Sequence, residues 1–397
     1  MVFLFVACLS VQAEPTELRG VWVTTVSNGD FPTQQDLSVE QMKRQADAYL
    51  DTAQSLGFNA IFFQSRPMGD AMYPSKIYPW SHFLTGTQGQ APANGFDPLR
   101  YWIDGAHKRG MQLHAWCNPS RVTHGSTTKD DLDPNNPAVL HPEWTFEKVN
   151  LLYLDPGIPE VRQLVISGLV EIVTNYEDID GIHFDDYFYP ARSTDEDAET
   201  FEKYGGDFMH IEDWRRNNIN LLVKEINEAM KKANPKVRWG ISPAGIWANQ
   251  GDDPAQAQHP EGSATRGNST YYAYYADTKK WVKEGWIDYI VPQIYWHIGF
   301  EIADFKTLVD WWSDVAEGTN VKLYIGMAAY RVGSNPRTTE AWNTPAELIR
   351  QLDYLKTKPN VDGFVMFTMR NFNRGTSVNR AMLEYFSEST NSSQNVN

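Results

Sequence analysis

Short apolar runs recur along the chain at regular spacing, and each run is nearly continuous instead of alternating with polar residues. Such runs are typical of parallel strands that are covered on both faces. The runs are Arg19–Val26, Phe58–Arg66, Met111–Asn118, Asp180–Tyr187, Val237–Ala244, Tyr289–Trp296, Val321–Ala329 and Gly363–Met369. The pattern therefore predicts eight strands.

The segments between these runs carry apolar residues three and four positions apart, which predicts amphipathic helices. Several of these segments end in a glycine just before the next strand, as helix C-caps do. Strand and helix alternate eight times, which predicts an α/β fold, a (β/α)8 TIM barrel with elongated βα loops, over residues 17–385. An open doubly wound sheet is the alternative, but no glycine-rich phosphate-binding sequence follows the first strand. The predicted helices are Val39–Leu56, Pro98–Arg109, Pro159–Tyr176, Ile211–Lys232, Tyr274–Glu284, Ile302–Val315 and Thr344–Lys356.

Polar and aromatic residues gather where the predicted strands end. Active sites of TIM barrels lie at this end, whereas the barrel interior favours branched aliphatic residues. We therefore expect a cleft there. The strand ends include Gln64–Pro67, Trp116–Arg121, His183–Tyr187, Ser242–Gly245, Gln293–His297, Tyr330–Arg331 and Thr368–Arg370.

Asp185 is the leading catalytic candidate, because it ends the fourth predicted strand. Strand alternation places it with His183 on the face that points into the barrel, and a carboxylate there is costly unless it is paired or used. Asp186 shares the other face with Phe184, so only the loop that follows can turn it inward. The alternative is that both carboxylates form salt bridges with Arg66, Arg121 or Arg331 and hold loops together.

Glycoside hydrolysis by two carboxyl groups needs a partner for Asp185, and the sequence does not identify one clearly. The fifth and sixth strands end in Ser242 and Gln293 instead of acids. Asp186 and Asp70, which follows the second strand, are the candidates. Assistance from an N-acetyl group of the substrate is a further option, which needs one protein acid and an orienting Tyr or Asp.

His183 and Asp185 resemble half of a metal site, with His114 or His297 to complete it. No His-x-His sequence occurs in the first strand and no other ligand pair is apparent, so we expect no metal and no cofactor. A hydrogen-bonded histidine that fills the barrel is the ordinary alternative. The candidate substrate-binding residues are Arg66, Trp116, Asn118, Arg121, His183, Tyr187, Gln293, Tyr295, Trp296 and Tyr330. Their aromatic rings suit sugar faces, and their amide and guanidinium groups suit hydroxyl, acetamido or carboxylate groups.

The net charge of −15 disfavours nucleic acid as a partner, because an acidic protein repels the phosphate backbone. Fourteen Trp, 19 Tyr and 19 Phe fit a glycan-binding cleft, although a large aromatic core would also account for them. Cys8 and Cys117 are the two cysteines, so a chain processed after residue 13 has no internal disulfide.

Residues 1–13 resemble a signal peptide or a lipoprotein leader, with an apolar run over Val2–Leu9. No Lys or Arg precedes that run, as expected if the true start lies upstream. Export is therefore predicted, to the periplasm or as an outer-membrane lipoprotein. Contact with a membrane is expected only through a lipid on Cys8. Residues 387–397 contain almost no apolar side chain, which predicts a disordered tail.

Several of these motifs resemble the bacterial family 10-like glycosyl hydrolases, over about residues 17–385. They are Glu17–Val23, Gly57–Ile61, Gln64–Pro67, Asp70–Tyr73, Pro79–Ser81, His114–Pro119, Tyr153–Gly157, Pro159–Arg162, Asp180–Pro190 and Val291–Trp296. The resemblance implies a (β/α)8 barrel, export to the cell envelope and cleavage of peptide-free peptidoglycan strands. It also implies Asp185 and Asp186 as the acidic motif. The same stretch is similar to a motif of chitinase-like barrels, but Tyr187 stands where those carry the catalytic Glu.

We therefore predict an exported glycoside hydrolase that cleaves an N-acetylated glycan by carboxylate acid/base catalysis, with peptide-free peptidoglycan as the leading candidate substrate. We expect its activity to peak below neutral pH, because the proton donor lies in an apolar setting. A non-catalytic glycan-binding barrel is the alternative, favoured by the missing acid on the fifth and sixth strands. An α-glucan hydrolase is a third interpretation.

Overall fold

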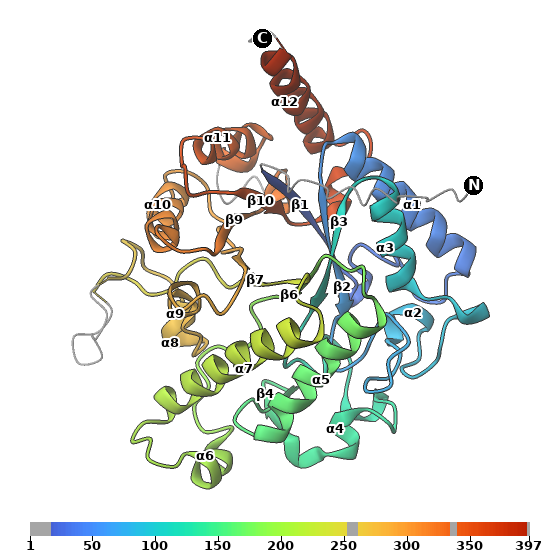
Figure 1. The fold of residues 1–397 in the computed structure, drawn as a ribbon, viewed down its shortest axis with the longest axis vertical. Coiled ribbons are helices and arrows are strands. Elements are labelled where there is room, and N and C mark those ends of the chain that lie inside the picture. Colours follow the sequence, from blue (N-terminus) through green and yellow to red (C-terminus); the bar gives the residue numbers. More distant parts are fainter. Residues whose placement is uncertain (1–16, 252–260, 334–339, 395–397) are drawn as a thin grey trace, which may run out of the picture.

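Eight parallel strands close into a barrel in the order β1, β10, β9, β8, β7, β6, β3, β2 (Figure 1). The last strand pairs with the first, and Leu18 lies opposite Gly363. The computed structural model describes residues 17–251, 261–333 and 340–394. The barrel strands are β1 (Leu18–Val23), β2 (Ala60–Arg66), β3 (Gln112–Cys117), β6 (Gly181–Phe184), β7 (Arg238–Ile241), β8 (Tyr289–Ile290), β9 (Lys322–Met327) and β10 (Gly363–Met366). All eight predicted strands are present, and the predicted TIM barrel is confirmed.

Several strands end earlier than the sequence predicts. β6 ends at Phe184 instead of Tyr187, and β8 has only two residues. Beyond these points the strands separate, and only isolated bridges such as Ala244–Gln293 continue the pairing. The polar residues at the predicted strand ends therefore lie in loops, where alternation along a strand no longer fixes their direction.

The helices follow the predicted segments closely. The predicted helix over Tyr274–Glu284 begins only at Thr278, because Tyr275 has a φ of +53° and the Asp277 side chain caps the helix by accepting a hydrogen bond from Lys280 N. The helices are α1 (Val39–Ser55), α2 (His82–Thr85), α3 (Pro98–Lys108), α4 (Pro137–Leu140), α5 (Pro159–Asn175), α6 (Ala198–Tyr204), α7 (Ile211–Ala233), α8 (Thr270–Ala273), α9 (Thr278–Lys283), α10 (Phe305–Ala316), α11 (Ala346–Leu355) and α12 (Ser377–Gln394).

The C-terminal helix α12 continues to Gln394, so it enters the segment for which we expect a disordered tail. Val378 and Met382 anchor its first turns in the core, and a helix that is already nucleated extends at little cost. The predicted leader, residues 1–13 with Cys8, and residues 395–397 lie outside the described residues. Within the described residues, no helix is long and apolar enough to cross a membrane.

The barrel interior is more aromatic than the sequence analysis predicts. Its buried cluster consists of Leu18, Trp22, Ala60, Phe62, Trp116, Tyr289, Val291, Tyr324 and Val365. Glycines in neighbouring strands make room for the rings. A Cβ on Gly181 would lie 2.2 Å from His114 Nδ1, and a Cβ on Gly240 would lie 2.2 Å from Tyr289 Cε2. Side chains, not an open pore, therefore fill the barrel beneath its mouth.

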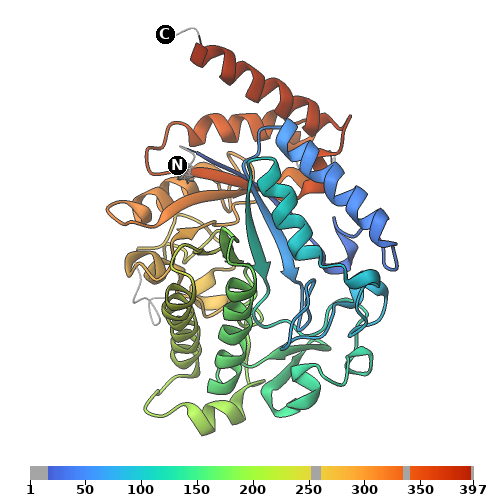
Figure 2. The ribbon, with the colours of Figure 1, turned by 45° about the vertical axis from the view of Figure 1, so that its right-hand side comes forward.

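Long loops gather at one end of the barrel. In Figure 2 the arrows of β2 and β3 point toward the end where α4 and α6 lie, whereas α12 (red) lies at the opposite end. The antiparallel hairpin of β4 (Thr145–Lys148) and β5 (Leu151–Leu154) belongs to the loop between β3 and α5. The predicted elongation of the βα loops is thus confirmed, and these loops surround the strand ends that carry the candidate residues.

Asp30 links the first of these loops to the last. Its Oδ2 accepts hydrogen bonds from Thr24 N and Oγ1, at 2.7 and 2.6 Å. Its Oδ1 accepts from Thr368 Oγ1 at 3.0 Å and from Arg370 N at 2.8 Å. All four lone-pair positions of this buried carboxylate are occupied. Because its partners follow β1 and β10, Asp30 joins the loops on both sides of the junction between the first and last strands.

Candidate active site

Asp185 is the first residue after β6, and it is held by side chains from the end of β3. Trp116 Nε1 donates a hydrogen bond of 2.9 Å to its Oδ2. Asn118 Nδ2 lies 3.1 Å from both carboxylate oxygens, and Tyr187 N donates to Oδ1 at 3.4 Å. Only 2% of Asp185 is exposed. The structure thus brings together four residues that the sequence selected, and Trp116 acts as a hydrogen-bond donor to Asp185.

The loop after β3 fixes the orientation of the Asn118 amide. Asn118 Oδ1 accepts hydrogen bonds from Arg121 N at 2.8 Å and from Ser120 N at 3.3 Å. With its oxygen bound in this way, the amide must direct its NH2 group toward Asp185. The short sequence Asn118-Pro119-Ser120-Arg121 therefore forms an Asx turn that positions the donor before any substrate arrives.

Arg121 lies in the same network but does not point freely into the cleft. Its Nε and Nη2 donate to Pro67 O at 3.1 and 2.8 Å, and its guanidinium lies 4.4 Å from the centre of the Tyr187 ring. Burial raises the pKa of Asp185, and the positive charge of Arg121 opposes that rise. Tyr187, 38% exposed, forms the outer face of this stack and is open to a ligand.

Asp186 faces the barrel mouth, although alternation along a predicted strand placed it on the other face from Asp185. Because β6 ends at Phe184, Asp186 belongs to the loop and is free to turn inward. It hydrogen-bonds to Gln293, which also donates to Ser242 O at 2.8 Å. Burial and the neighbouring charge of Asp185 raise the pKa of Asp186 to about 7. Two interacting carboxyl groups release their protons as a pair, so near neutral pH the pair carries one proton for much of the time.

Aromatic side chains stand opposite this pair. The Tyr295 ring lies 5.9 Å from the Tyr330 ring and 6.0 Å from the Phe367 ring. The pKa of Tyr295 lies well above its ordinary value because of burial and, to a smaller degree, the charge of Asp186, which places its phenol within electrostatic reach of Asp186. Tyr330, at the rim, is 37% exposed, and half-buried Trp296 packs against Gly245. This aromatic wall and the carboxyl pair lie at the same end of the barrel, and exposed rings beside acids suit a sugar.

His183 lies below the carboxyl pair, within the filled barrel. Its Nε2 accepts a hydrogen bond from Trp22 Nε1 at 3.1 Å and lies 3.0 Å from Ser242 Oγ. Burial lowers the pKa of His183 to about 3, so the imidazole is neutral. The sequence allowed two roles for His183, substrate binding or filling the barrel, and these contacts match the second. Among the described residues, no group of three or more His, Cys, Asp or Glu side chains is arranged to hold a metal ion.

Arg66 and Asp70 lie apart from this network. The pairing of β2 with β3 shifts between Gln64 and Arg66, and the Arg66 guanidinium then lies 4.4 Å from the centre of the Tyr78 ring, against Gly168 of α5. Asp70 is fully buried, and its Oδ2 lies 3.4 Å from Gln88 Nε2 and 3.8 Å from His82 Nδ1. Asp186, by contrast, interacts directly with Asp185, so the geometry favours Asp186 as its partner.

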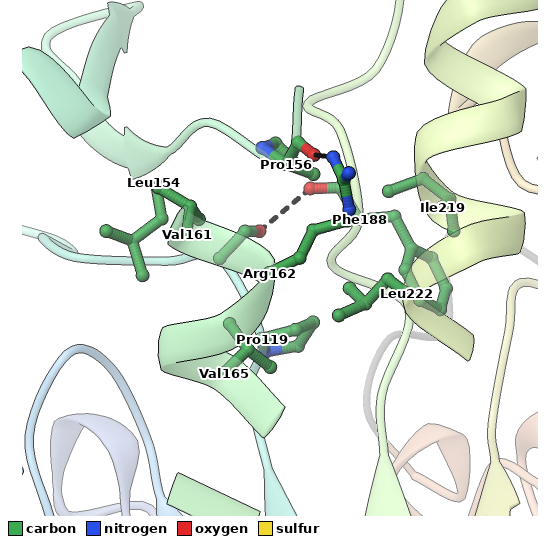
Figure 3. A pocket seen from close by; sticks show the side chains of 10 residues that line it. Pro119, Leu154, Pro156, Val161, Arg162, Val165, Phe188, Ile219 and Leu222 are labelled. Carbon is green, nitrogen blue, oxygen red and sulfur yellow. Dashed lines mark hydrogen bonds between the residues drawn. The ribbon is translucent and has the colours of Figure 1, made fainter. Parts of the chain in front are cut away.

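A separate apolar cavity lies between α5 and α7 (Figure 3). Its lining includes Val161, Val165, Phe188 and Leu222. At about 10 Å³ it has room for no more than one water molecule. It is therefore a packing gap behind the loop of Asn118, too small for a sugar.

Comparison with known proteins identifies the family. The family described as glycosyl hydrolase-like 10 matches residues 17–344. The chain belongs to this family. The membership confirms the predicted enzyme class, a glycoside hydrolase. Glycosyl hydrolase YngK of Bacillus subtilis (strain 168) is 44% identical over 363 residues, which cover 90% of this chain and 69% of that protein. Glycosyl hydrolase DigH of Escherichia coli (strain K12) is 40% identical over 378 residues, which cover 90% of this chain and 84% of DigH.

Solved structures with the same fold include other glycosidase barrels. An endo-1,4-β-D-mannanase of Thermotoga petrophila RKU-1 matches with a TM-score of 0.53 and 12% identity, over 89% of this chain and 88% of the mannanase. The catalytic domain of a β-amylase of Paenibacillus polymyxa has a TM-score of 0.51 and 14% identity, over 85% and 93%. An α-L-fucosidase of Paenibacillus thiaminolyticus has a TM-score of 0.56 and 15% identity, over 93% of this chain but only 48% of the fucosidase. At these identities the likeness concerns the fold.

Two residues of the cleft escaped the sequence analysis. Phe367 directly follows β10, and its ring also lies 6.0 Å from that of Trp22. Tyr274 lies between α8 and α9, and burial, with a smaller effect of Asp186, raises its pKa. Phe367 could have been found from the sequence, because active-site residues of TIM barrels lie at the carboxyl ends of the strands. Tyr274 lies far along the loop after β7, and no local signal indicates that the loop returns to Asp186.

Proposed function

We propose that this glycoside hydrolase cleaves peptide-free peptidoglycan strands, with Asp186 as the proton donor and Asp185 as its ionised partner. One observation carries the proposal: Asp185 and Asp186 lie side by side at a barrel mouth lined by aromatic rings, and their surroundings differ. When the surroundings of two adjacent acids push their pKa values apart, the acid with the higher pKa can donate a proton while the other is ionised.

Asp186 suits the role of general acid. The pKa of about 7 keeps a proton on it at mildly acidic pH, and its half-buried carboxyl can reach a ligand in the cleft. Donating that proton to the glycosidic oxygen makes the leaving group a neutral alcohol. Gln293, which follows β8 two strands away in the barrel, fixes the carboxyl by a hydrogen bond.

Asp185 suits the role of a fixed negative charge. Trp116 and Asn118 donate to it, and Arg121 favours its ionised form. This charge stabilises the positive charge that develops at the anomeric carbon. It also maintains the raised pKa of Asp186, so the two acids depend on each other.

The choice of peptidoglycan rests on the family resemblance of the motifs and on the leader-like residues 1–13. Both sugars of peptidoglycan carry a 2-acetamido group, and the Asp, Asn and Tyr side chains of the cleft can hydrogen-bond to it. The protein then acts outside the cytoplasm, in the periplasm or anchored to the outer membrane through Cys8.

Release of reducing ends from peptide-free glycan strands tests the proposal. Wild-type enzyme should release them, whereas Asp186→Asn and Asp185→Asn should not. Starch-like polymers and peptide-bearing peptidoglycan serve as comparison substrates. Binding of the strands without release of reducing ends from any glycan would instead support the non-catalytic binder, and activity restricted to starch-like polymers would support an α-glucan hydrolase.

A further inference from the structure

The cleft lacks an obvious protein nucleophile, although the carboxyl pair supplies a proton donor. A retaining glycosidase with two carboxylates needs one of them free to attack the anomeric carbon. Asp185 does not meet this condition. Its Oδ2 accepts from Trp116 and Asn118, and its Oδ1 accepts from Asn118 and Tyr187 N. Three donors, the Trp116 indole, the Asn118 amide and the Tyr187 N–H, thus surround the carboxylate, and only 2% of the residue is exposed.

The other acids that follow barrel strands, Asp30 and Asp70, are buried as well. Asp30, after β1, has all four lone-pair positions occupied by Thr24, Thr368 and Arg370. Asp70, after β2, is fully buried beside Gln88. Ser242 and Gln293, not acids, follow β7 and β8, the next two strands of the barrel after β6. The described strand ends therefore present one available acid, Asp186. Tyr295, which follows β8, packs its ring 5.9 Å from that of Tyr330 and lies within electrostatic reach of Asp186.

We propose that the nucleophile is the 2-acetamido oxygen of the substrate itself, and that Tyr295 orients this group toward the anomeric carbon. This inference rests on the proposed function, because it requires an N-acetylated sugar at the point of cleavage. Tyr295 is half-buried and held edge-on by Tyr330, so its phenol has a fixed direction. A protonated phenol is a hydrogen-bond donor, as a carbonyl oxygen requires.

The chemistry balances without a co-reactant other than water. In the first step the acetamido oxygen forms a bond to the anomeric carbon, the glycosidic bond breaks, and the proton of Asp186 passes to the leaving oxygen. In the second step a water oxygen bonds to the anomeric carbon and opens the oxazolinium ring. The water gives its proton to Asp186. Two displacements at one carbon retain its configuration.

The test uses purified full-length enzyme and peptide-free glycan strands, either N-acetylated or N-trifluoroacetylated. We expect the newly released ends to keep the anomeric configuration of the substrate, as read by NMR before mutarotation. Fluorine withdraws electrons from the acetamido oxygen, so turnover should fall by about 100-fold or more, equivalent to two decades in rate. Inverted product, an unchanged rate on the trifluoroacetyl strands, or a covalent glycosyl adduct on Asp185 would overturn the inference.

Inhibition by an N-acetylglucosamine thiazoline, a stable mimic of the cyclic intermediate, tests Tyr295 directly. The Tyr295→Phe variant should bind it about tenfold more weakly, the effect of one lost hydrogen bond of about 1.4 kcal/mol. Tyr354→Phe on α11, where the phenol donates to Asp310, is the matched control and should bind it as the wild type does. Equal inhibition of both variants would overturn the role of Tyr295.

The two levels of the proposal fail in different ways. Turnover of N-acetylated strands with inversion would leave the proposed function intact and remove the substrate-assisted step. Absence of turnover on every N-acetylated glycan would remove the proposed function and, with it, the inference.

Discussion

Trp116 donates its indole N–H to Asp185 across 2.9 Å, linking the end of β3 to the end of β6. Both residues are almost completely buried, at 6% and 2% exposure. A hydrogen bond to a buried carboxylate stabilises the ionised form, typically by about 1.5 to 3 kcal/mol. The charge of Asp185 therefore depends on a neighbouring strand as well as on its own.

Replacing Trp116 with Phe should raise the pKa of Asp185, because burial already raises it and one of the opposing donors is lost. If Asp185 must be ionised, activity will decline at a higher pH on the acidic side, by about one to two units. The pH profile of kcat/KM for Trp116→Phe against the wild type measures this shift. If kcat/KM is lower at every pH but its decline on the acidic side occurs at the same pH as in the wild type, Trp116 serves packing alone.

Asp185→Asn should lower the pKa of Asp186. In the wild type, burial and the Asp185 charge together raise that pKa to about 7, so the protonated acid is lost as pH rises through about 7. Without the neighbouring charge, deprotonation begins at a lower pH, and the alkaline limb of any residual activity should move in the acidic direction. Carbon-13 NMR of the Asp186 carboxyl gives the same result without activity. An unmoved titration would contradict the coupling of the two acids.

Asp186→Asn should abolish turnover on strands that the variant still binds, because Asn has no acidic proton to donate. The expected loss is about 100-fold to 10,000-fold in kcat. Asp70→Asn is the matched control, since Asp70 contacts Gln88 and His82 instead of the carboxyl pair. A comparable loss of kcat in a folded Asp70→Asn enzyme would identify Asp70 as the partner acid instead.

Asp155 should make the fold less stable as the pH rises. It is almost fully buried, and burial raises its pKa to about 6 although Thr200 and Gly157 donate to it. A carboxyl with a raised folded-state pKa binds protons more tightly in the folded than in the unfolded chain, so stability falls between about pH 4 and pH 6. Its contribution should be on the order of 1 to 3 kcal/mol.

Urea unfolding of the wild type and Asp155→Asn at pH 4.5 and at pH 7.5 measures this contribution. Asn does not ionise, so the variant should lose less unfolding free energy between the two conditions than the wild type does. An identical loss in both proteins would show that other groups set the pH dependence.

The barrel could be predicted from the sequence because its strands are buried on both faces, which leaves continuous apolar runs. The same pattern placed Asp185, Trp116 and Asn118 at the barrel mouth, since every TIM barrel gathers the carboxyl ends of its strands there. Asp186 was harder to place, because the prediction extended β6 past Phe184 and applied alternation to a residue that lies in a loop.

The remaining differences come from contacts between distant segments. Arg66 turns toward α5 after a register shift between β2 and β3, and the sequence of β2 alone carries no sign of that shift. Tyr274 approaches Asp186 through a loop that returns over the mouth. The position of Asp185 beside Trp116 and Asn118 was thus predictable, whereas the placement of Arg66 and Tyr274 depends on how loops and helices pack against each other.

The bonds of Asp30 have a consequence for the order in which this enzyme matures. Its partners Thr24 and Thr368 lie near opposite ends of the sequence, so the ring cannot close until the ribosome has released nearly the whole chain. Contacts of such long sequence separation slow folding. During synthesis the strands already made have an unpaired edge, and the nascent enzyme remains inactive until its first and last loops meet.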